Sequence, residues 1–150
     1  MQPTSMLLTL LGLSTYTSAS SLQINNYCTD SLWTTLTSPS QPFAEPFEIP
    51  SGVANISDIS GSGNSLGVTF SKDYYAENTP KLVLGFTSVN GRLWWSLGDI
   101  SGDPFKGKAF NVTTPDHDGK DVCGDAVGVD GENHNCEEGD FTLTFNPCFE

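Results

Sequence analysis

The sequence predicts an all-β protein: a compact antiparallel β-sandwich with two disulfides. Short runs of β-forming residues alternate apolar and polar side chains, as strands with one buried face do. Segments rich in glycine, proline, serine and asparagine separate these runs and are typical of turns. No stretch shows the apolar spacing of a long amphipathic helix.

The first half of the chain predicts three strands. Residues 22–26 alternate apolar and polar side chains, and residues 31–37 are rich in β-formers. Residues 38–50 contain four prolines and should form an extended surface connection, because proline is excluded from helix interiors and central strands. A glycine-rich turn at residues 61–65 should precede a short strand at residues 66–70.

A β-hairpin is the strongest local signal. Residues 81–89 and 92–97 read as strands, and Asn90 and Gly91 separate them. Both residues tolerate the positive φ that a type I′ two-residue turn requires. Residues 98–104 should end the second strand.

The last third of the chain changes in composition. Acidic residues and glycines dominate residues 116–140, which predicts a long polar surface loop tied by Cys123 and Cys136. Residues 140–145 alternate again and should form the last strand.

Residues 1–19 are expected to be a signal peptide. Their apolar run is followed by small residues ending at Ala19, and it is too short to span a bilayer. An apolar first strand or helix is the alternative. Residues 20–150 would then form one domain of a secreted protein, located outside the cell or in the cell wall.

The charge balance limits the partners. The chain has 18 acidic and 6 basic residues, a formal charge of −12. Such a surface repels phosphates and anionic lipids, so we expect no binding to nucleic acid or membrane. It would attract cations or basic proteins, although acidity also simply maintains solubility. We expect a monomer without a cofactor.

The four cysteines are Cys28, Cys123, Cys136 and Cys148. An even number in a small secreted domain predicts two disulfides, and the residues alone leave three pairings open. Their spacing matches no zinc site, so no metal is expected there.

Catalytic residues are not predicted. Residues 63–67 match the G-x-S-x-G nucleophile motif, but they precede a strand where that motif needs a strand-to-helix turn. His117 and His134 both lie in the acidic segment and are expected to be solvated, so no nucleophile–base pair can be assembled.

The acidic segment also invites a cation-binding interpretation through five aspartates: Asp116, Asp118, Asp121, Asp125 and Asp130. Calcium prefers such oxygen ligands. The spacing fails the EF-hand pattern, because Lys120 occupies the fifth position and Asp121 the sixth, where glycine is required. We expect a solvated run of charges and no metal site; an irregular cation-binding loop is the alternative.

Three residues are candidates for ligand binding: Trp94, Asp99 and Asp103. Adjacent residues of a strand point to opposite faces, so one of Trp94 and Trp95 should be buried and the other exposed. An exposed tryptophan can stack on a sugar, and two carboxylates about 5 to 9 Å apart can hydrolyse a glycoside. The alternative is that both aspartates accept hydrogen bonds from turn amides.

Two acceptor motifs for N-glycosylation occur, Asn55-Ile56-Ser57 and Asn111-Val112-Thr113. In a secreted chain Asn55 and Asn111 should both be exposed.

Two segments resemble a known family. Residues 24–28, followed by Leu32 and Trp33, resemble the start of thaumatin-like proteins. Residues 94–105, with the sequence WWSLGDISGDPF, are similar to the WYDLSDxxGDPF element of small fungal Bys1 proteins. A terminal strand with a final cysteine, residues 141–148, also fits. The resemblance covers nearly all the mature chain and implies a secreted fungal β-sandwich without an established catalytic role.

The resemblance also implies that the first and last strands lie together. The expected pairing is therefore Cys28 with Cys148, which leaves Cys123 with Cys136 around one polar loop. Larger thaumatin-like relatives bind or cleave β-1,3-glucan through an acidic cleft. This chain lacks their many cysteines and one wall of that cleft, so Arg92, Asp99 and Asp103 would be at most remnants of such a set.

The expected function is that of a non-enzymatic extracellular or cell-wall protein that binds β-glucan, another cell-wall polysaccharide, or a host or competitor protein. One alternative is a weak β-1,3-glucan hydrolase using Asp99 and Asp103. The other is a cation-binding surface protein using residues 116–140.

Overall fold

The computed structural model describes residues 21–137, 139 and 141–149. The expected signal peptide, residues 1–19, lies outside the described residues. The described residues form eleven β-strands. Within this part of the chain, no helix is long and apolar enough to cross a membrane.

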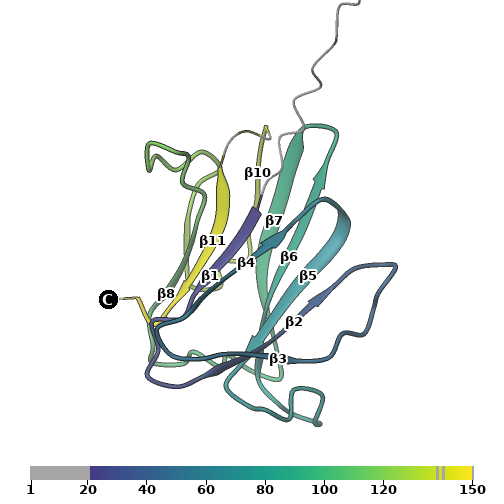
Figure 1. Ribbon diagram of the computed structural model, residues 1–150, viewed down its shortest axis with the longest axis vertical. Coiled ribbons are helices and arrows are strands. Elements are labelled where there is room, and N and C mark those ends of the chain that lie inside the picture. The colour runs from purple at the N-terminus through teal and green to yellow at the C-terminus, as the bar shows by residue number, and fades with distance from the viewer. Residues whose placement is uncertain (1–20, 138, 140, 150) are drawn as a thin grey trace, which may run out of the picture.

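The strands form two facing sheets (Figure 1). The five-stranded sheet has the order β4 (Ala54–Asp58), β1 (Ser21–Asn25), β11 (Thr142–Pro147), β8 (Phe110–Thr113), β9 (Ala126–Val127). The six-stranded sheet has the order β10 (Asn133–Glu137), β7 (Arg92–Ile100), β6 (Lys81–Val89), β5 (Gly61–Thr69), β2 (Leu32–Thr37), β3 (Phe47–Ile49). Neighbouring strands are antiparallel except β1 and β11, which are parallel. This confirms the predicted all-β sandwich.

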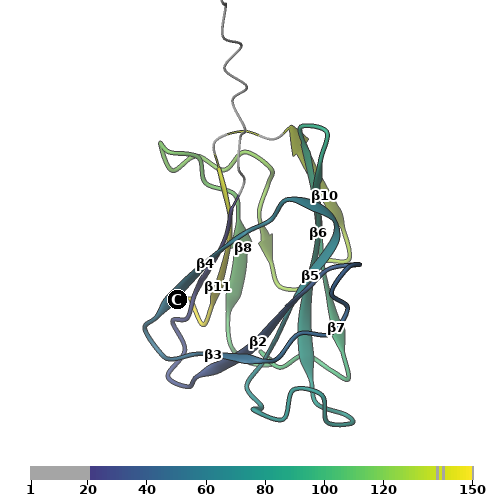
Figure 2. The same cartoon turned by 45° about the vertical axis from the view of Figure 1, so that its right-hand side comes forward.

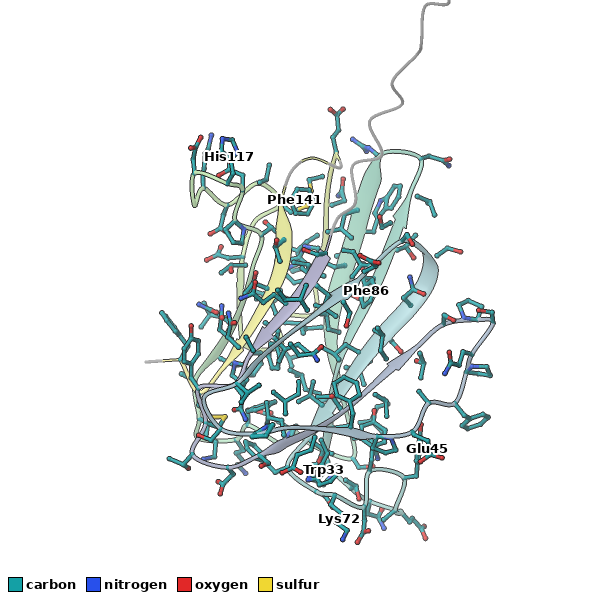
Figure 3. All side chains as sticks on the ribbon, viewed as in Figure 1. Trp33, Glu45, Lys72, Phe86, His117 and Phe141 are labelled. Atoms are coloured by element: carbon teal, nitrogen blue, oxygen red, sulfur yellow. A yellow bond between two sulfur atoms is a disulfide. The ribbon has the colours of Figure 1, made fainter. Side chains whose placement is uncertain are left out.

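The hydrophobic core fills the space between the sheets, and the turned view of Figure 2 separates the two layers. Alternate residues of each central strand point inward, among them Leu84 and Phe86 of β6. Figure 3 shows Phe86 between the layers. In β7, Trp95 is 2% exposed and Trp94 is 37% exposed. The prediction that the two tryptophans face opposite ways is confirmed.

The predicted hairpin is confirmed and is longer than expected. Asn90 and Gly91 both have positive φ, 53° and 71°, and connect β6 to β7. Strand β7 continues to Ile100, because Lys81 at the start of β6 still provides a pairing partner there. The expectation that residues 98–104 end the strand is therefore wrong for its first three residues.

Two other local predictions are wrong. Residues 61–65 belong to β5, whose pairing with β6 shifts register between Gly61 and Asn64, as at a β-bulge. The acidic segment is not a simple loop, because it contains β9 and β10. Both differences arise from pairing with distant strands, which overrides the weak local preference of polar and glycine-rich sequence.

Two disulfides are present, with the pairing expected from the family resemblance. Cys28 and Cys148 follow β1 and β11, and their Cα atoms are 4.9 Å apart. Cys123 and Cys136 have Cα atoms 5.0 Å apart. Since Cys136 lies in β10 and Cys123 follows β8, this second bridge links the edges of the two sheets.

A loop phenylalanine closes one end of the sandwich. Phe105 is fully buried, and its ring centroid lies 5.2 Å from that of Phe70, 5.4 Å from Phe110 and 5.7 Å from Phe145. The Phe105 amide donates to Asp103 Oδ1 at 2.8 Å, which holds the loop in the turn that directs this ring inward.

Asp103→Ala should therefore lower the free energy of unfolding by about 1 kcal/mol, because the Phe105 amide loses its acceptor. Asp99→Ala is the matched control and should change stability by less than about 0.5 kcal/mol, as exposed positions usually do. Urea unfolding of both variants measures the difference. Equal losses in the two variants would contradict a specific role for Asp103 in the turn.

The outer face of the six-stranded sheet is covered at one place by a tyrosine. Tyr74 is buried against Gly67 of β5, and burial raises the pKa of its hydroxyl. A methyl group at Gly67 would overlap that hydroxyl. Gly67 is therefore required because the Tyr74 side chain occupies the space where its own would lie.

Gly67→Ala should destabilise the protein by about 1–3 kcal/mol, because Tyr74 must leave its site. Gly85→Ala is the matched control on β6, where an added methyl would meet only Ser96 Oγ at 3.9 Å. That variant should be neutral or slightly stabilising, since alanine restricts the unfolded chain more than glycine does. Thermal unfolding compares the two, and similar melting temperatures would show that Tyr74 does not constrain residue 67.

Candidate functional site

The three predicted ligand-binding residues do not come together. Trp94 lies on the outer face of β7, opposite Thr87 of β6. Asp99 pairs with Leu82, five residues further along β7, which is about 17 Å at the usual strand rise. Because five is an odd number, Asp99 also points to the opposite side from Trp94. Asp103 lies in the turn that positions Phe105.

Trp94 and Asp99 therefore do not share one face of β7, and a ligand-binding role for Trp94, Asp99 and Asp103 stays a prediction. Arg92 is even further from Asp99 than Trp94 is, since it begins β7 and is seven positions from Asp99 along the same strand. The three residues had been considered together because they are close in the sequence. The continuation of β7 to Ile100 carries Asp99 away from Trp94.

Trp94 instead borders a shallow trough of about 330 Å³ on the outer face of the six-stranded sheet, here called the Trp94 trough. Four strands contribute to it, since β5, β6, β7 and β10 are consecutive neighbours. Its lining residues are Gly63, Asn64, Gly85, Phe86, Thr87, Trp94, Trp95, Ser96 and Asn133. None of these side chains is charged.

The floor of the trough is a glycine. Gly85 pairs with Ser65 on one side and with Ser96 on the other, and Ser96 pairs with Asn133. The space above Gly85 is open, unlike the space above Gly67. This contrast places a hollow beside Trp94 and a filled surface beside Tyr74.

The trough also has a fixed rim. Thr87 Oγ1 accepts a hydrogen bond from the Gly63 amide at 2.9 Å, which holds the irregular start of β5 against β6. An indole, hydroxyl groups and an amide thus surround an open, uncharged floor. This combination suits a neutral ligand that offers both apolar faces and hydroxyl groups.

A second, larger hollow of about 640 Å³ lies beside the Cys28–Cys148 disulfide. The rings of Tyr27 and Phe149 border it, with centroids 5.9 Å apart, and both are about half exposed. Sequence reasoning missed this site. The signal was present, because each aromatic residue is adjacent to a cysteine of the same bridge and the bridge must bring the two rings together.

The prediction that His134 is solvated is wrong, because its side chain is only 13% exposed. Its ring stacks on Trp95 with a centroid distance of 3.9 Å and an interplanar angle of 9°, and its Nε2 lies 2.9 Å from Asp130 Oδ2. The cause is strand pairing, since His134 of β10 lies opposite Trp95. The Glu132 amide, and secondarily His134, lower the pKa of Asp130. His117, in contrast, is exposed at the end of the molecule opposite Lys72 (Figure 3).

Two other aspartates of the acidic segment, Asp116 and Asp121, accept backbone amides. Asp116 Oδ1 accepts the amides of Asp118 and Lys120, each at 2.9 Å, and these bonds lower the pKa of Asp116. Asp121 Oδ1 accepts the Thr114 amide at 2.8 Å.

The five aspartates considered for calcium do not converge. In the part of the chain that the structure describes, clusters of potential metal ligands form two separate triplets: Asp116, His117 and Asp118, and Asp130, Glu132 and His134. A single five-aspartate site is therefore wrong, because only Asp116 and Asp118 share a triplet and β9 lies between Asp125 and Asp130.

Both glycosylation motifs lie on strands. Asn55 is on β4 and Asn111 on β8, and both are only half-buried.

The fold is similar to those of known proteins, and two of the similar solved structures illustrate this. The protein elicitor MoHrip2 from Magnaporthe oryzae superposes with a TM-score of 0.69 at 16% identity, over 87% of this chain and 100% of that chain. The thaumatin-like xylanase inhibitor TLXI superposes with a TM-score of 0.52 at 14% identity, over 85% of this chain and 99% of that chain. At such low identities these similarities establish a shared fold.

No curated protein sequence matches the chain. The family model Bys1, described as Blastomyces yeast-phase-specific protein, matches residues 10–147. That match covers most of the sequence and confirms the resemblance first drawn from residues 94–105. The chain belongs to the Bys1 family.

Proposed function

We propose that this protein is a non-enzymatic, secreted binding protein whose Trp94 trough takes a neutral cell-wall polysaccharide, with β-glucan as the favoured class. The observation that carries the proposal is an exposed indole beside an uncharged, glycine-floored trough, on a chain with a formal charge of −12. No charged side chain lines the trough, and the nearest charge along the strand is Arg92, two positions from Trp94 on the same side of β7.

The chemistry of the trough supports a sugar polymer. Sugar rings present apolar C–H faces that pack on an indole, and their hydroxyl groups both donate and accept hydrogen bonds. Thr87 and Ser96 offer hydroxyl groups, and Asn133 offers an amide. The trough is shallow and crosses several strands, which suits a segment of an extended chain better than a small molecule that needs an enclosed pocket.

Two further observations support a non-catalytic, extracellular role. Asp103 accepts a hydrogen bond from the Phe105 amide, and Asp99 lies about 17 Å along the strand from Trp94, so neither carboxylate faces the trough. Two disulfides in a small domain are typical of an oxidising compartment. The names of the two structural neighbours, an elicitor and an inhibitor, also support recognition as the mode of action.

A second candidate is the binding of another protein through the hollow between Tyr27 and Phe149. Half-exposed aromatic rings next to a hollow are the kind of anchor that protein interfaces use. The disulfide between the neighbouring cysteines fixes both rings, so little conformational freedom would be lost on binding.

The first test measures depletion of the mature protein from solution by insoluble β-1,3-glucan. Trp94→Ala should weaken binding about tenfold, equivalent to about 1.4 kcal/mol, because the stacking surface is lost. Phe43→Ala is the control, since Phe43 is 79% exposed and does not line the trough. Loss of binding in Tyr27→Ala with full binding in Trp94→Ala would move the site to the second hollow. Release of soluble sugars would instead establish a hydrolase.

The second test fills the trough. Gly85→Thr should abolish binding and preserve the fold, because a β-branched side chain suits a strand and occupies the open floor. Gly98→Thr on β7 is the matched control: its surroundings are also open, but Gly98 does not line the trough. Equal affinity of the two variants, each with an unchanged melting temperature, would show that the polymer binds elsewhere.

A further inference from the structure

A row of side-chain amides crosses the outer face of the five-stranded sheet. Gln23 Nε2 donates to Asn25 Oδ1 at 2.7 Å, and Asn25 Nδ2 donates to Asn146 Oδ1 at 2.8 Å. Asn146 Nδ2 then donates to Asn111 Oδ1 at 2.8 Å. The row therefore runs from β1 across β11 to β8, and we call it the amide row.

The amide row has a direction. Asn146, at its centre, is only 9% exposed, and both its oxygen and its nitrogen are hydrogen-bonded. Every donation runs toward β8, so Asn111 is the terminal acceptor. Its Oδ1 is held by Asn146, and among the described residues its Nδ2 has no hydrogen-bond acceptor. The row thus fixes the orientation of the Asn111 amide and leaves the nitrogen available.

The three central strands β1, β11 and β8 carry no charged residue on this outer side. Residues on the outer side of the three central strands carry hydroxyl or amide groups: Ser21, Gln23, Asn25, Asn111, Thr113, Thr142, Thr144 and Asn146. Thr113, the third residue of the Asn111 motif, lies on this same side, two positions along β8. A face of neutral donors and acceptors is complementary to a sugar chain.

We propose that Asn111, and not Asn55, carries an N-linked glycan, and that this glycan lies over the outer face of the five-stranded sheet. In the transfer, Nδ2 bonds to the anomeric carbon of a polyprenyl-diphosphate-linked oligosaccharide. The bond from that carbon to the diphosphate oxygen breaks, the diphosphate leaves with the electron pair, and the amide gives up one proton. Asn111 Oδ1 still accepts the hydrogen bond from Asn146, which keeps the modified amide in place on the row.

Asn55 is placed differently. It pairs with Ile24, a core residue, and side chains of directly opposed residues share one side of a sheet. Asn55 therefore points toward the core side of β4, and its Oδ1 accepts the Ser57 hydroxyl of its own motif at 3.4 Å. A branched sugar on Asn55 would therefore start on the core side of β4 and could reach solvent only past this edge strand.

A glycan on Asn111 would close one outer face to partners and leave the Trp94 trough, on the other sheet, open. The glycan proposal does not depend on the polysaccharide proposal. Each face is tested by a different measurement, and either can fail alone.

The experiment expresses the full chain in a secreting fungal host and maps peptides after amidase release of N-glycans in heavy-oxygen water, which marks each modified asparagine. Asn111 should be marked and Asn55 should not. Thr113→Val removes the acceptor motif and keeps Asn111 and the amide row, so it should lose the glycan. Ser57→Ala is the matched control and should leave the glycan unchanged. A bare Asn111 peptide, or a mark on Asn55 alone, overturns the assignment.

Hydroxyl-radical footprinting tests where the glycan lies. Ile56 and Val127 flank the face on β4 and β9 and are 66% and 78% exposed. Their oxidation should be lower in the glycosylated protein than in Thr113→Val. Oxidation of Trp94, on the other sheet, should be equal in both. Equal oxidation of Ile56 and Val127 in the two proteins would show a glycan that extends into solvent and would overturn its placement on the sheet.

Discussion

The parallel pairing of β1 with β11 is the interaction on which the rest of the structure depends. It joins residues 121 positions apart, through the Ser21–Thr142 and Asn25–Asn146 side-chain hydrogen bonds as well as the strand ladder. It also places Cys28 beside Cys148. In the chain-entropy model a bridge closing 120 residues contributes about 5 kcal/mol, because the unfolded chain loses that much freedom. Without this pair the five-stranded sheet would divide into two fragments, each too small to cover the core.

The alternation of side chains along β7 then determines which of its residues face solvent. Trp95 enters the core and pairs with His134, whereas Trp94 faces outward beside Gly85. The same alternation turns Asp99 away from Trp94. Residues of one sequence motif on a strand can therefore point to opposite faces and form no common site. In this chain the GDPF element serves the fold, through Asp103 and Phe105, while only the first tryptophan of the motif contributes to the trough.

Local chemistry explains what the sequence could predict. Asn90-Gly91 defines its hairpin because the turn geometry is set by those two residues alone, and the opposite orientations of Trp94 and Trp95 follow from any strand. Strands β4 and β8 were missed, since their polar sequences resemble loops until β1 and β11 pair with them. The Trp94 trough could not be predicted from the sequence for the same reason. Gly85 and Asn133 are 48 positions apart, and they come near each other only because both pair with Ser96 of β7. The β1–β11 pair and its disulfide were predicted only through the family resemblance.

The distribution of charge links fold to function. Nine of the 18 acidic residues lie in residues 116–140, among them Glu137 in the edge strand β10, and two others lie in edge strands, Glu48 in β3 and Asp58 in β4. A charged edge disfavours pairing with a strand of another chain. Of the seven central strands, β1, β2, β5, β6, β8 and β11 contain no acidic residue, and β7 contains one, Asp99. Acidic residues are thus concentrated in loops and at edges, while the outer face of the six-stranded sheet carries the basic residues Lys81 and Arg92. What the two faces bind is therefore selected mainly by shape and hydrogen bonding, and the acidic rim keeps anionic polymers at a distance.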